Sequence, residues 1–221
     1  MSCPHAAGLR PELEPLPRRM QTLPVDKRGY VIPWFVDYLD GEPEFRAMDQ
    51  YKWMRAVRER LCWVCGQKLG VHLSFVIGPM CGINRTTSEP PCHHDCATWS
   101  SRNCPFLSRP HMVRREDDLS EAIAENVAGI HIRRNPGVSL VWTTREYLVF
   151  DDGSGRPLIR IADPESTEWW HEGKPATREQ VSASVASGLP ALRAVAATEG
   201  PAALAELELM VAKFEKFLPA T

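Results

Sequence analysis

The chain has 221 residues, of which 43% are hydrophobic and 24% are charged, and its formal net charge is −2. This composition excludes wholesale disorder and is typical of a globular protein with one sizeable core, with or without a small metal-stapled module. No apolar run approaches the ~18–20 residues of a membrane-spanning helix, and the N-terminus lacks the apolar stretch of a signal peptide. We therefore expect a cytoplasmic protein with no membrane partner.

The N-terminal part is predicted to consist of two regions. Residues 1–29 are rich in proline and charge, which favours an extended leader. Residues 30–115 then form a cysteine-rich basic module, which opens with an aromatic patch interrupted by Pro33. From about residue 44 to residue 61, apolar residues recur at helical spacing, which predicts a helix.

The cysteines are concentrated in the middle of the chain, where six of the seven lie between Cys62 and Cys104. In a reducing cytosol such a cluster is more typical of metal binding than of disulfides. Cys62-Trp-Val-Cys65-Gly66 has the form of a zinc knuckle, because two thiolates at i and i+3 chelate one ion when glycine permits the tight turn. Residues 71–80 are expected to supply a β-hairpin after this knuckle.

A second group of metal-binding residues follows at the start of a predicted helix. Pro90 and Pro91 favour a helix that begins near residue 90 and presents either Cys92 and Cys96 or His93 and Cys96 on one face. Knuckle, hairpin and helix in this order resemble a treble-clef zinc finger. We predict Zn²⁺ bound by Cys62, Cys65 and Cys96, with Cys92 or His93 as the fourth ligand and Cys104 in reserve.

Two other kinds of metal site remain open on the sequence alone. Cys81, Cys92, Cys96 and Cys104 together would suit an iron–sulfur cluster or redox centre. A metal-dependent hydrolase or nuclease would use His93, His94 or Asp95 with the bound ion, although several nearby cysteines favour a closed structural site. The sequence leaves open whether the protein is an enzyme.

The remaining region, residues 116–221, is predicted to contain a small β-meander and a helical C-terminus. Thr177 and Gln180 form a capping box, Gly188 is a stop signal, and Pro201 is a favourable first helical residue. The last helix has an apolar face suited to the core or to a protein partner. The predicted elements are a polar helix over 117–128, strands over 138–143, 147–150 and 157–161, and helices over 177–188, 190–198 and 201–218. The fold class is therefore α+β, with a central treble-clef-like zinc module.

The charge of the cysteine-rich part differs from that of the rest of the chain. Between Arg46 and Arg115 there are 11 Lys and Arg residues against 4 Asp and Glu, whereas the remainder has 15 against 24. A basic surface with interleaved aromatic rings, from Trp53, Trp63, Trp99 and Phe106, is typical of contact with nucleic acid or another anionic macromolecule. The candidate contact residues are Arg55, Arg58, Arg85, Arg102, Arg109, Arg114 and Arg115.

Several short strings also carry a family resemblance that spans about residues 24 to 218. They include Leu61-Cys-Trp-Val-Cys-Gly, Phe75-Val-Ile-Gly-Pro-Met-Cys, Ser88-Glu-Pro-Pro-Cys-His and Cys104-Pro-Phe-Leu. Together they resemble a family of uncharacterised cysteine-rich proteins from bacteriophages and bacteria. The resemblance implies a phage or mobile-element origin and transfers no functional residue. The functional prediction is a zinc-binding accessory protein with a basic face.

Overall fold

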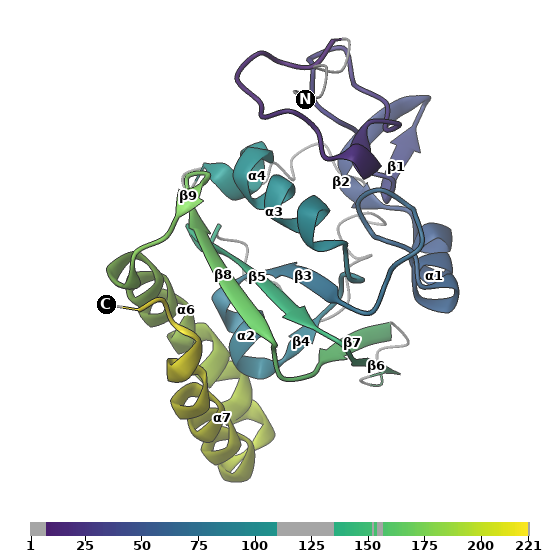
Figure 1. Cartoon of the computed structure of the whole chain (residues 1–221). Helices are drawn as coiled ribbons and strands as arrows, with labels where there is room; N and C mark the ends of the chain where they lie inside the picture. Colours follow the sequence, from purple (N-terminus) through teal and green to yellow (C-terminus); the bar gives the residue numbers. More distant parts are fainter. Residues whose placement is uncertain (1–7, 110–134, 152, 154–156, 221) are drawn as a thin grey trace.

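The computed structural model describes residues 8–109, 135–151, 153 and 157–220 (Figure 1). Within these ranges the protein is a mixed α and β structure with three antiparallel sheets. The α+β prediction is therefore confirmed. The polar helix predicted over 117–128 lies outside the described residues.

The N-terminal segment is packed against the rest of the protein. Apart from a short 3-10 helix, η1 (Arg18–Met20), residues 8–35 have no helix or paired strand longer than one isolated bridge. Trp99 Nε1 nevertheless donates to the Glu14 carbonyl at 3.1 Å, and the Glu14 N–H donates to Asn103 Oδ1 at 2.9 Å. The segment also buries six apolar side chains, those of Leu9, Leu13, Leu16, Met20, Val31 and Ile32. The described part of this segment has little regular structure and contributes to the core.

A β-hairpin and a helix precede the knuckle. Strands β1 (Val36–Leu39) and β2 (Glu42–Met48) pair antiparallel, and helix α1 (Gln50–Glu59) follows. The helix predicted from about residue 44 therefore begins six residues later. Asp49 is its N-cap and accepts the backbone N–H groups of Tyr51 at 2.9 Å and Lys52 at 3.1 Å. This cap defines the start of the helix because it satisfies donors that have no partner within the first turn.

The two larger sheets combine strands that are distant in sequence. One has the order β3-β5-β8-β9 and the other β4-β7-β6. Strands were correctly predicted near 138–143, 147–150 and 157–161, but the continuous meander is wrong, because β5 pairs with β3 and β8 whereas β6 pairs with β7. The strands are β3 (Leu73–Ile77), β4 (Thr86–Thr87), β5 (Ser139–Thr144), β6 (Tyr147–Asp151), β7 (Pro157–Ile161), β8 (Ser166–His171) and β9 (Lys174–Pro175).

The hairpin expected between knuckle and helix is not formed. Strand β3 leads directly into helix α2 (Pro79–Asn84), and β3 and β4 belong to different sheets. The predicted helix start near residue 90 is also wrong, since helix α3 spans His94–Asn103. A treble-clef architecture is therefore not confirmed, although a Cys/His cluster is present at the predicted place.

The four-stranded sheet is covered by helices on both faces (Figure 1). Helix α3 packs against β3 and β5. Ser74 and Thr143 lie on this face of the sheet, next to Val76 and Val141, and share a hydrogen bond of 2.8 Å between their hydroxyls. On the opposite face, Leu140 and Trp169 contact helix α2 and Phe214. Because side chains alternate along a strand, these two sets of residues lie on opposite faces, and each face packs against a helix.

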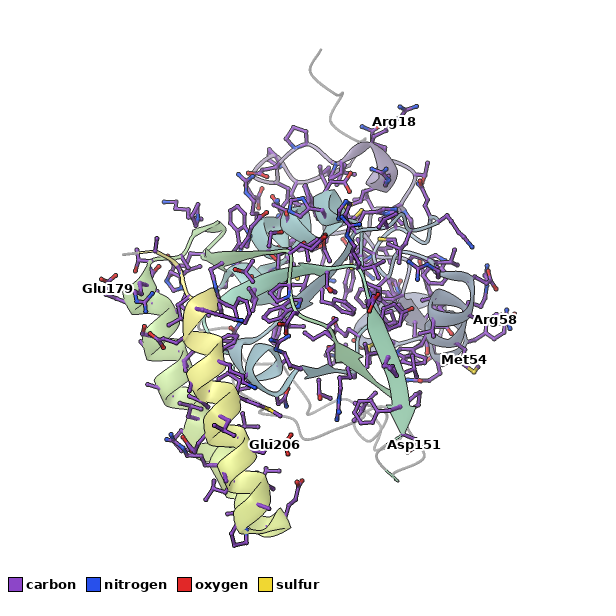
Figure 2. The ribbon with its side chains drawn as sticks, turned by 60° about the horizontal axis from the view of Figure 1, so that its bottom comes forward. Arg18, Met54, Arg58, Asp151, Glu179 and Glu206 are labelled. Carbon is purple, nitrogen blue, oxygen red and sulfur yellow. The ribbon has the colours of Figure 1, made fainter. Side chains whose placement is uncertain are left out.

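The C-terminus is a pair of long helices that extends from the body of the protein (Figures 1 and 2). Helix α6 (Arg178–Glu199) begins with the predicted capping box between Thr177 and Gln180, and α7 (Pro201–Phe214) and η2 (Glu215–Phe217) follow. The stop predicted at Gly188 is wrong, because α6 continues through Gly188 and Pro190. Gly188 lies so close to Met80 that an added Cβ would be 2.9 Å from its sulfur, so glycine there permits close helix packing.

Helix α4 (Pro105–Ser108) completes the described helices. None of the helices in the described ranges is both long and apolar enough to cross a bilayer. The cytoplasmic location stays a prediction.

Candidate metal centre

The knuckle after α1 is a tight, hydrogen-bonded loop. The Cys62 N–H donates to the Gln67 carbonyl at 2.8 Å, and the Gly66 N–H donates to the Cys62 carbonyl at 2.8 Å. Gly66 has φ +72°, a left-handed conformation that is unfavourable for residues with a Cβ. The loop therefore turns Cys62 and Cys65 toward the same side, as the Cys-x-x-Cys-Gly spacing predicts.

The start of helix α3 brings two further ligand candidates to the knuckle. Its N-cap residue is His93, whose carbonyl accepts the Ala97 N–H at 2.9 Å, and Cys96 lies in its first turn. The Trp63 N–H donates to the Pro91 carbonyl at 3.0 Å, which joins the knuckle to the chain just before this helix. An N-cap residue and a residue three positions later project toward the same region.

Cys62, Cys65, His93 and Cys96 form a compact, buried group. Their four ligand atoms all lie within 4.8 Å of one another, which is close enough to hold a metal ion. His93 Nδ1 is 3.4 Å from Cys65 Sγ and 4.0 Å from Cys96 Sγ. Zinc bond lengths place neighbouring ligand atoms of a tetrahedral site about 3.5–3.8 Å apart, so the arrangement needs only small adjustments. No residue of the group is more than 8% exposed.

Hydrogen bonds around the group orient its ligand atoms. His93 Nε2 lies 2.9 Å from the Lys68 carbonyl oxygen, and a carbonyl only accepts. Nε2 therefore carries a proton, and Nδ1 is the nitrogen that faces the sulfurs and becomes a metal ligand once its own proton is lost. The backbone N–H groups of Cys65 and His93 donate to Cys62 Sγ at 3.5 and 3.4 Å. Such donors stabilise a thiolate.

The electrostatics of the group favour a cation. Burial opposes ionisation of Cys62, but hydrogen bonds from Cys65 and its other neighbours outweigh it and lower the Cys62 pKa. Hydrogen bonds to Cys62 and then to Cys65 raise the pKa of His93 to about 10 and also raise the pKa of Cys96. In the absence of a metal the cluster thus holds a thiolate stabilised by nearby protons. A divalent cation would replace those protons.

The other cysteines in the described part of the chain lie outside this four-residue group. Cys92 is buried beside it, on backbone that exchanges two hydrogen bonds with Ser74, at 2.7 and 2.9 Å. Cys104 is the residue between α3 and α4, and Cys81 lies within α2. Of the three residues considered for the fourth position, His93 belongs to the group of ligand atoms within 4.8 Å of one another, and Cys92 and Cys104 do not. Helix α3 begins only at His94, so Cys92 is still in extended backbone that is paired with Ser74.

The two residues suggested for hydrolytic chemistry besides His93 point elsewhere. His94 Nε2 is 2.6 Å from a carboxylate oxygen of Glu168, and Arg19 pairs with Asp95 at 3.0 Å. Both pairs are substantially exposed. The arrangement does not direct either side chain at the buried group.

Most of the described arginines that were predicted to contact an anionic partner have partners within the chain. Arg55 and Arg58 both pair with Glu59, Arg85 pairs with Asp163, and Arg102 pairs with Glu14. Figure 2 shows Arg58 extending outward from α1. Trp53, Trp63 and Trp99 are buried, so they are not available to stack on bases. Arg114 and Arg115 lie outside the described residues, and binding to nucleic acid or another anion stays a prediction.

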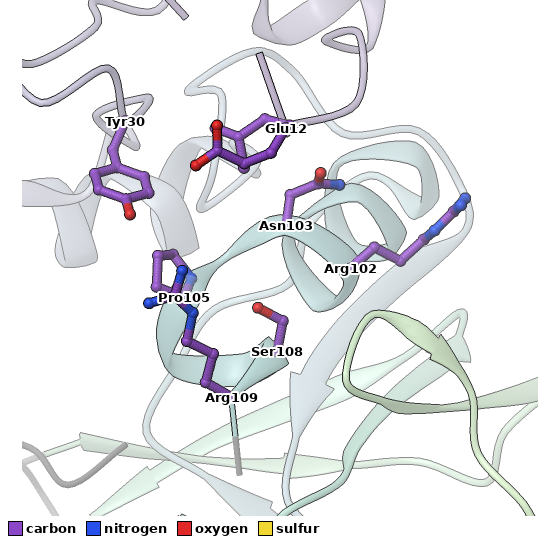
Figure 3. A pocket seen from close by; sticks show the side chains of 8 residues that line it. Glu12, Tyr30, Arg102, Asn103, Pro105, Ser108 and Arg109 are labelled. Atoms are coloured by element: carbon purple, nitrogen blue, oxygen red, sulfur yellow. The ribbon is translucent and has the colours of Figure 1, made fainter. Parts of the chain in front are cut away.

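Arg109 lines a hollow between the N-terminal segment and helices α3 and α4 (Figure 3). The hollow has a volume of about 140 Å³, and Arg102 and Glu12 also contribute to its wall. Its remaining lining residues are Leu13, Tyr30, Asn103, Pro105 and Ser108. The hollow is small and mixes carboxylate with guanidinium, so it does not indicate a ligand class.

Comparisons with protein-family models, curated proteins and solved structures find no match to this chain. The resemblance to phage and bacterial proteins therefore stays a prediction.

Proposed function

We propose that Cys62, Cys65, His93 and Cys96 bind one zinc ion, and that this ion has a structural role. The observation that carries the proposal is the gathering of four buried ligand atoms within 4.8 Å of one another. The orientation of His93 supports it, because its outer nitrogen is anchored on the Lys68 carbonyl while its inner nitrogen faces two sulfurs. Anchoring a ligand histidine in this way is typical of metal sites.

The ligand types favour zinc over iron and over a catalytic centre. Three thiolates and one imidazole are a common structural zinc set, whereas iron–sulfur clusters prefer cysteine throughout. The proposed set leaves out Cys81, Cys92 and Cys104, which the iron–sulfur alternative needs. A hydrolytic zinc keeps one coordination position for water, whereas the four protein ligands here would fill all four positions of a zinc ion.

The position of the group gives the ion a clear structural task. The group joins the loop after α1 to the start of α3. These two segments are distant in sequence, since Cys65 and His93 are 28 positions apart. The same loop also holds the N-terminal segment: Gln67 Nε2 donates to the Arg19 carbonyl at 2.9 Å, and the Trp34 N–H donates to the Val64 carbonyl at 2.7 Å. Loss of the ion would therefore loosen the N-terminal half of the described structure.

The first test is metal analysis and an absorption spectrum on protein purified without oxygen. We expect about one zinc per chain and no visible colour. Replacement of zinc by cobalt should then produce the intense visible bands of a tetrahedral thiolate site. Iron with acid-labile sulfide and a brown colour would overturn the proposal in favour of a cluster.

Matched cysteine variants test which residues bind. Cys65→Ser should lower the zinc content strongly, whereas Cys104→Ser should leave it unchanged, because Cys104 lies outside the proposed group. His93→Cys should retain zinc, since a fourth thiolate is an accepted substitute for imidazole. Full zinc content in Cys65→Ser would contradict the ligand assignment.

A further inference from the structure

The outer face of helix α1 combines exposed apolar side chains with a cation. Tyr51 is 62% exposed and Met54 is 55% exposed. They share this face with Arg58, whose side chain is 69% exposed, because residues at i, i+3 and i+7 lie on one side of a helix. Figure 2 shows Met54 and Arg58 pointing away from the body of the protein. Tyr, Met and Arg are residue types enriched at binding interfaces, so this face has the composition of an interface.

A second exposed tyrosine lies beside the helix. Tyr38 of β1 is 45% exposed, and the Lys52 ammonium lies 5.8 Å from the centre of its ring. Lys52 Nζ also donates to the Val36 carbonyl at 2.8 Å, which joins α1 to strand β1. Because Lys52 directly follows Tyr51, the hairpin and the helix present two tyrosines and a lysine in one region of the surface.

The charges of this region are mainly positive. Residues 49–60 contain four Lys and Arg side chains against two carboxylates. Arg55 and Arg58 both pair with Glu59, at 3.1 and 2.6 Å, and one carboxylate balances the charge of only one guanidinium. Partly exposed ion pairs of this kind contribute little to stability, so phosphate oxygens can compete for the same donors. The region therefore has a surplus of about two positive charges beside its exposed rings.

The knuckle loop fixes the C-terminal end of α1. The Leu61 N–H donates to the Ala56 carbonyl at 2.9 Å, and Lys68 Nζ donates to the Glu59 carbonyl at 2.6 Å. A helix held in this way presents its side chains on a rigid element, which reduces the entropy that binding costs.

We propose that this surface of β1 and α1 binds single-stranded nucleic acid, with bases stacked on the Tyr38 and Tyr51 rings and phosphates contacted by the cations of α1. Stacking on a protein ring requires a base that is free of a duplex, so the surface fits single strands. Cations and ring faces make the contacts, and neither distinguishes ribose from deoxyribose, so DNA and RNA of one sequence should bind alike. This inference goes beyond the zinc-binding function and does not depend on which metal is bound.

The test follows the fluorescence anisotropy of a labelled, mixed-sequence DNA strand of about 15 nucleotides as the full chain is added. We expect the single strand to bind at least about 5-fold more tightly than the duplex of the same sequence. Two to three phosphate contacts should give a slope of about −1.4 to −2.1 in log affinity against log salt concentration. The RNA strand should bind within about threefold of the DNA strand. Absence of binding at about 50 mM salt, tighter binding of the duplex, or strong discrimination between DNA and RNA would overturn the proposal.

Two matched pairs of variants locate the site. Tyr51→Ala should weaken binding of the single strand about 5-fold or more, whereas Tyr51→Phe keeps the ring and should bind as the wild type does. Arg58→Ala should weaken binding and make the salt slope shallower by about 0.7. Arg193→Ala removes an exposed arginine that also pairs with a glutamate, on helix α6 at the other side of the molecule from α1 (Figure 1), and should change neither quantity. Wild-type affinity in both Tyr51→Ala and Arg58→Ala would refute the assignment of the surface.

Polyglutamate distinguishes a stacking surface from a general anion site. We expect it to bind more weakly than the DNA strand at the same concentration of charge, and Tyr51→Ala should leave its affinity unchanged. Equal binding of the two polymers, or an equal loss for both in Tyr51→Ala, would indicate an acidic protein partner and contradict the proposal. Zinc content should stay at the wild-type level in every variant, because the altered side chains are exposed. Protein without zinc refutes the metal function, whereas zinc-containing protein that does not bind single strands refutes only this inference.

Discussion

The stability of the folded chain should depend on free zinc, and the dependence has a predictable slope. An ion that binds only the folded state adds RT ln(1 + [Zn]/Kd) to the free energy of unfolding, so each tenfold rise in free zinc above Kd adds about 1.4 kcal/mol. For a domain of this size 1 kcal/mol corresponds to roughly 2–4 °C in Tm, so the Tm should rise by about 3–6 °C per decade.

The structure explains why the unfolded chain does not bind comparably. The ligands come from two segments, with Cys65 and His93 separated by 28 positions, and the knuckle alone contributes only two sulfurs. The assay is thermal unfolding in metal-buffered solutions that span several decades of free zinc, followed by tryptophan fluorescence. Trp63, between the two knuckle cysteines and 1% exposed, is a local reporter.

Neighbouring histidines supply a matched pair of variants. His93→Ala removes a proposed ligand, and because loss of outer-shell contacts alone costs about 10–100-fold in affinity, its rise in Tm should begin at zinc concentrations at least about 100-fold higher. His94→Ala removes an exposed side chain paired with Glu168 and should reproduce the wild-type curve. A wild-type Tm that is independent of zinc, or identical curves for the two variants, would refute the reasoning.

Three further outcomes follow from the same structure. Zinc binding should release at least two protons at pH 7, because the pKa values of His93 (about 10) and Cys96 are raised without a metal. The zinc affinity should therefore fall by about two log units for each pH unit of acidification. Calorimetry in buffers of different ionisation enthalpy measures the number of protons released, and a value of zero would contradict the prediction. Gly66→Ala should lower the free energy of unfolding by about 2–4 kcal/mol and weaken zinc retention, because φ is +72° and the new Cβ would lie 2.7 Å from the Trp34 ring. An unchanged midpoint of urea unfolding would argue against the loop geometry. Gly82→Ala should cost about 1–3 kcal/mol while leaving zinc content intact, because its Cβ would meet the Phe214 ring of α7 at 2.7 Å, on the face of the sheet opposite α3. Loss of zinc in this variant would show that the two regions are coupled.

Features encoded by short-range spacing were predicted well. The Cys62-x-x-Cys65-Gly66 pattern identifies a turn that brings two candidate metal ligands together, because only a few residues and one left-handed conformation are involved. The capping box at Thr177 is equally local, since it depends on two side chains and two backbone groups within one turn. Strands near 139–144, 147–151 and 157–161 follow from their apolar, β-branched composition.

Features that depend on packing between distant segments were predicted poorly. Strand β5 pairs with β3 and β8 rather than with its sequence neighbour β6, because pairing depends on which faces are buried together. Helix α6 continues through Gly188 and Pro190, although each residue is a local stop signal. Burial of Val181, Leu189 and their neighbours against the body of the protein offsets that local cost.

The choice of the fourth ligand depends both on short-range spacing and on packing between distant segments. Sequence spacing limited the fourth ligand to Cys92 or His93, with Cys104 in reserve. Each of these residues is close enough in sequence to the predicted helix to join the two cysteines of the knuckle. The preference for His93 comes from tertiary contacts. Cys92 is paired with Ser74 of β3, so helix α3 starts only at His94, and the Lys68 carbonyl orients the His93 imidazole. Local chemistry specifies which side chains are able to bind a metal, whereas the packing of remote backbone determines which of them face the same point in space.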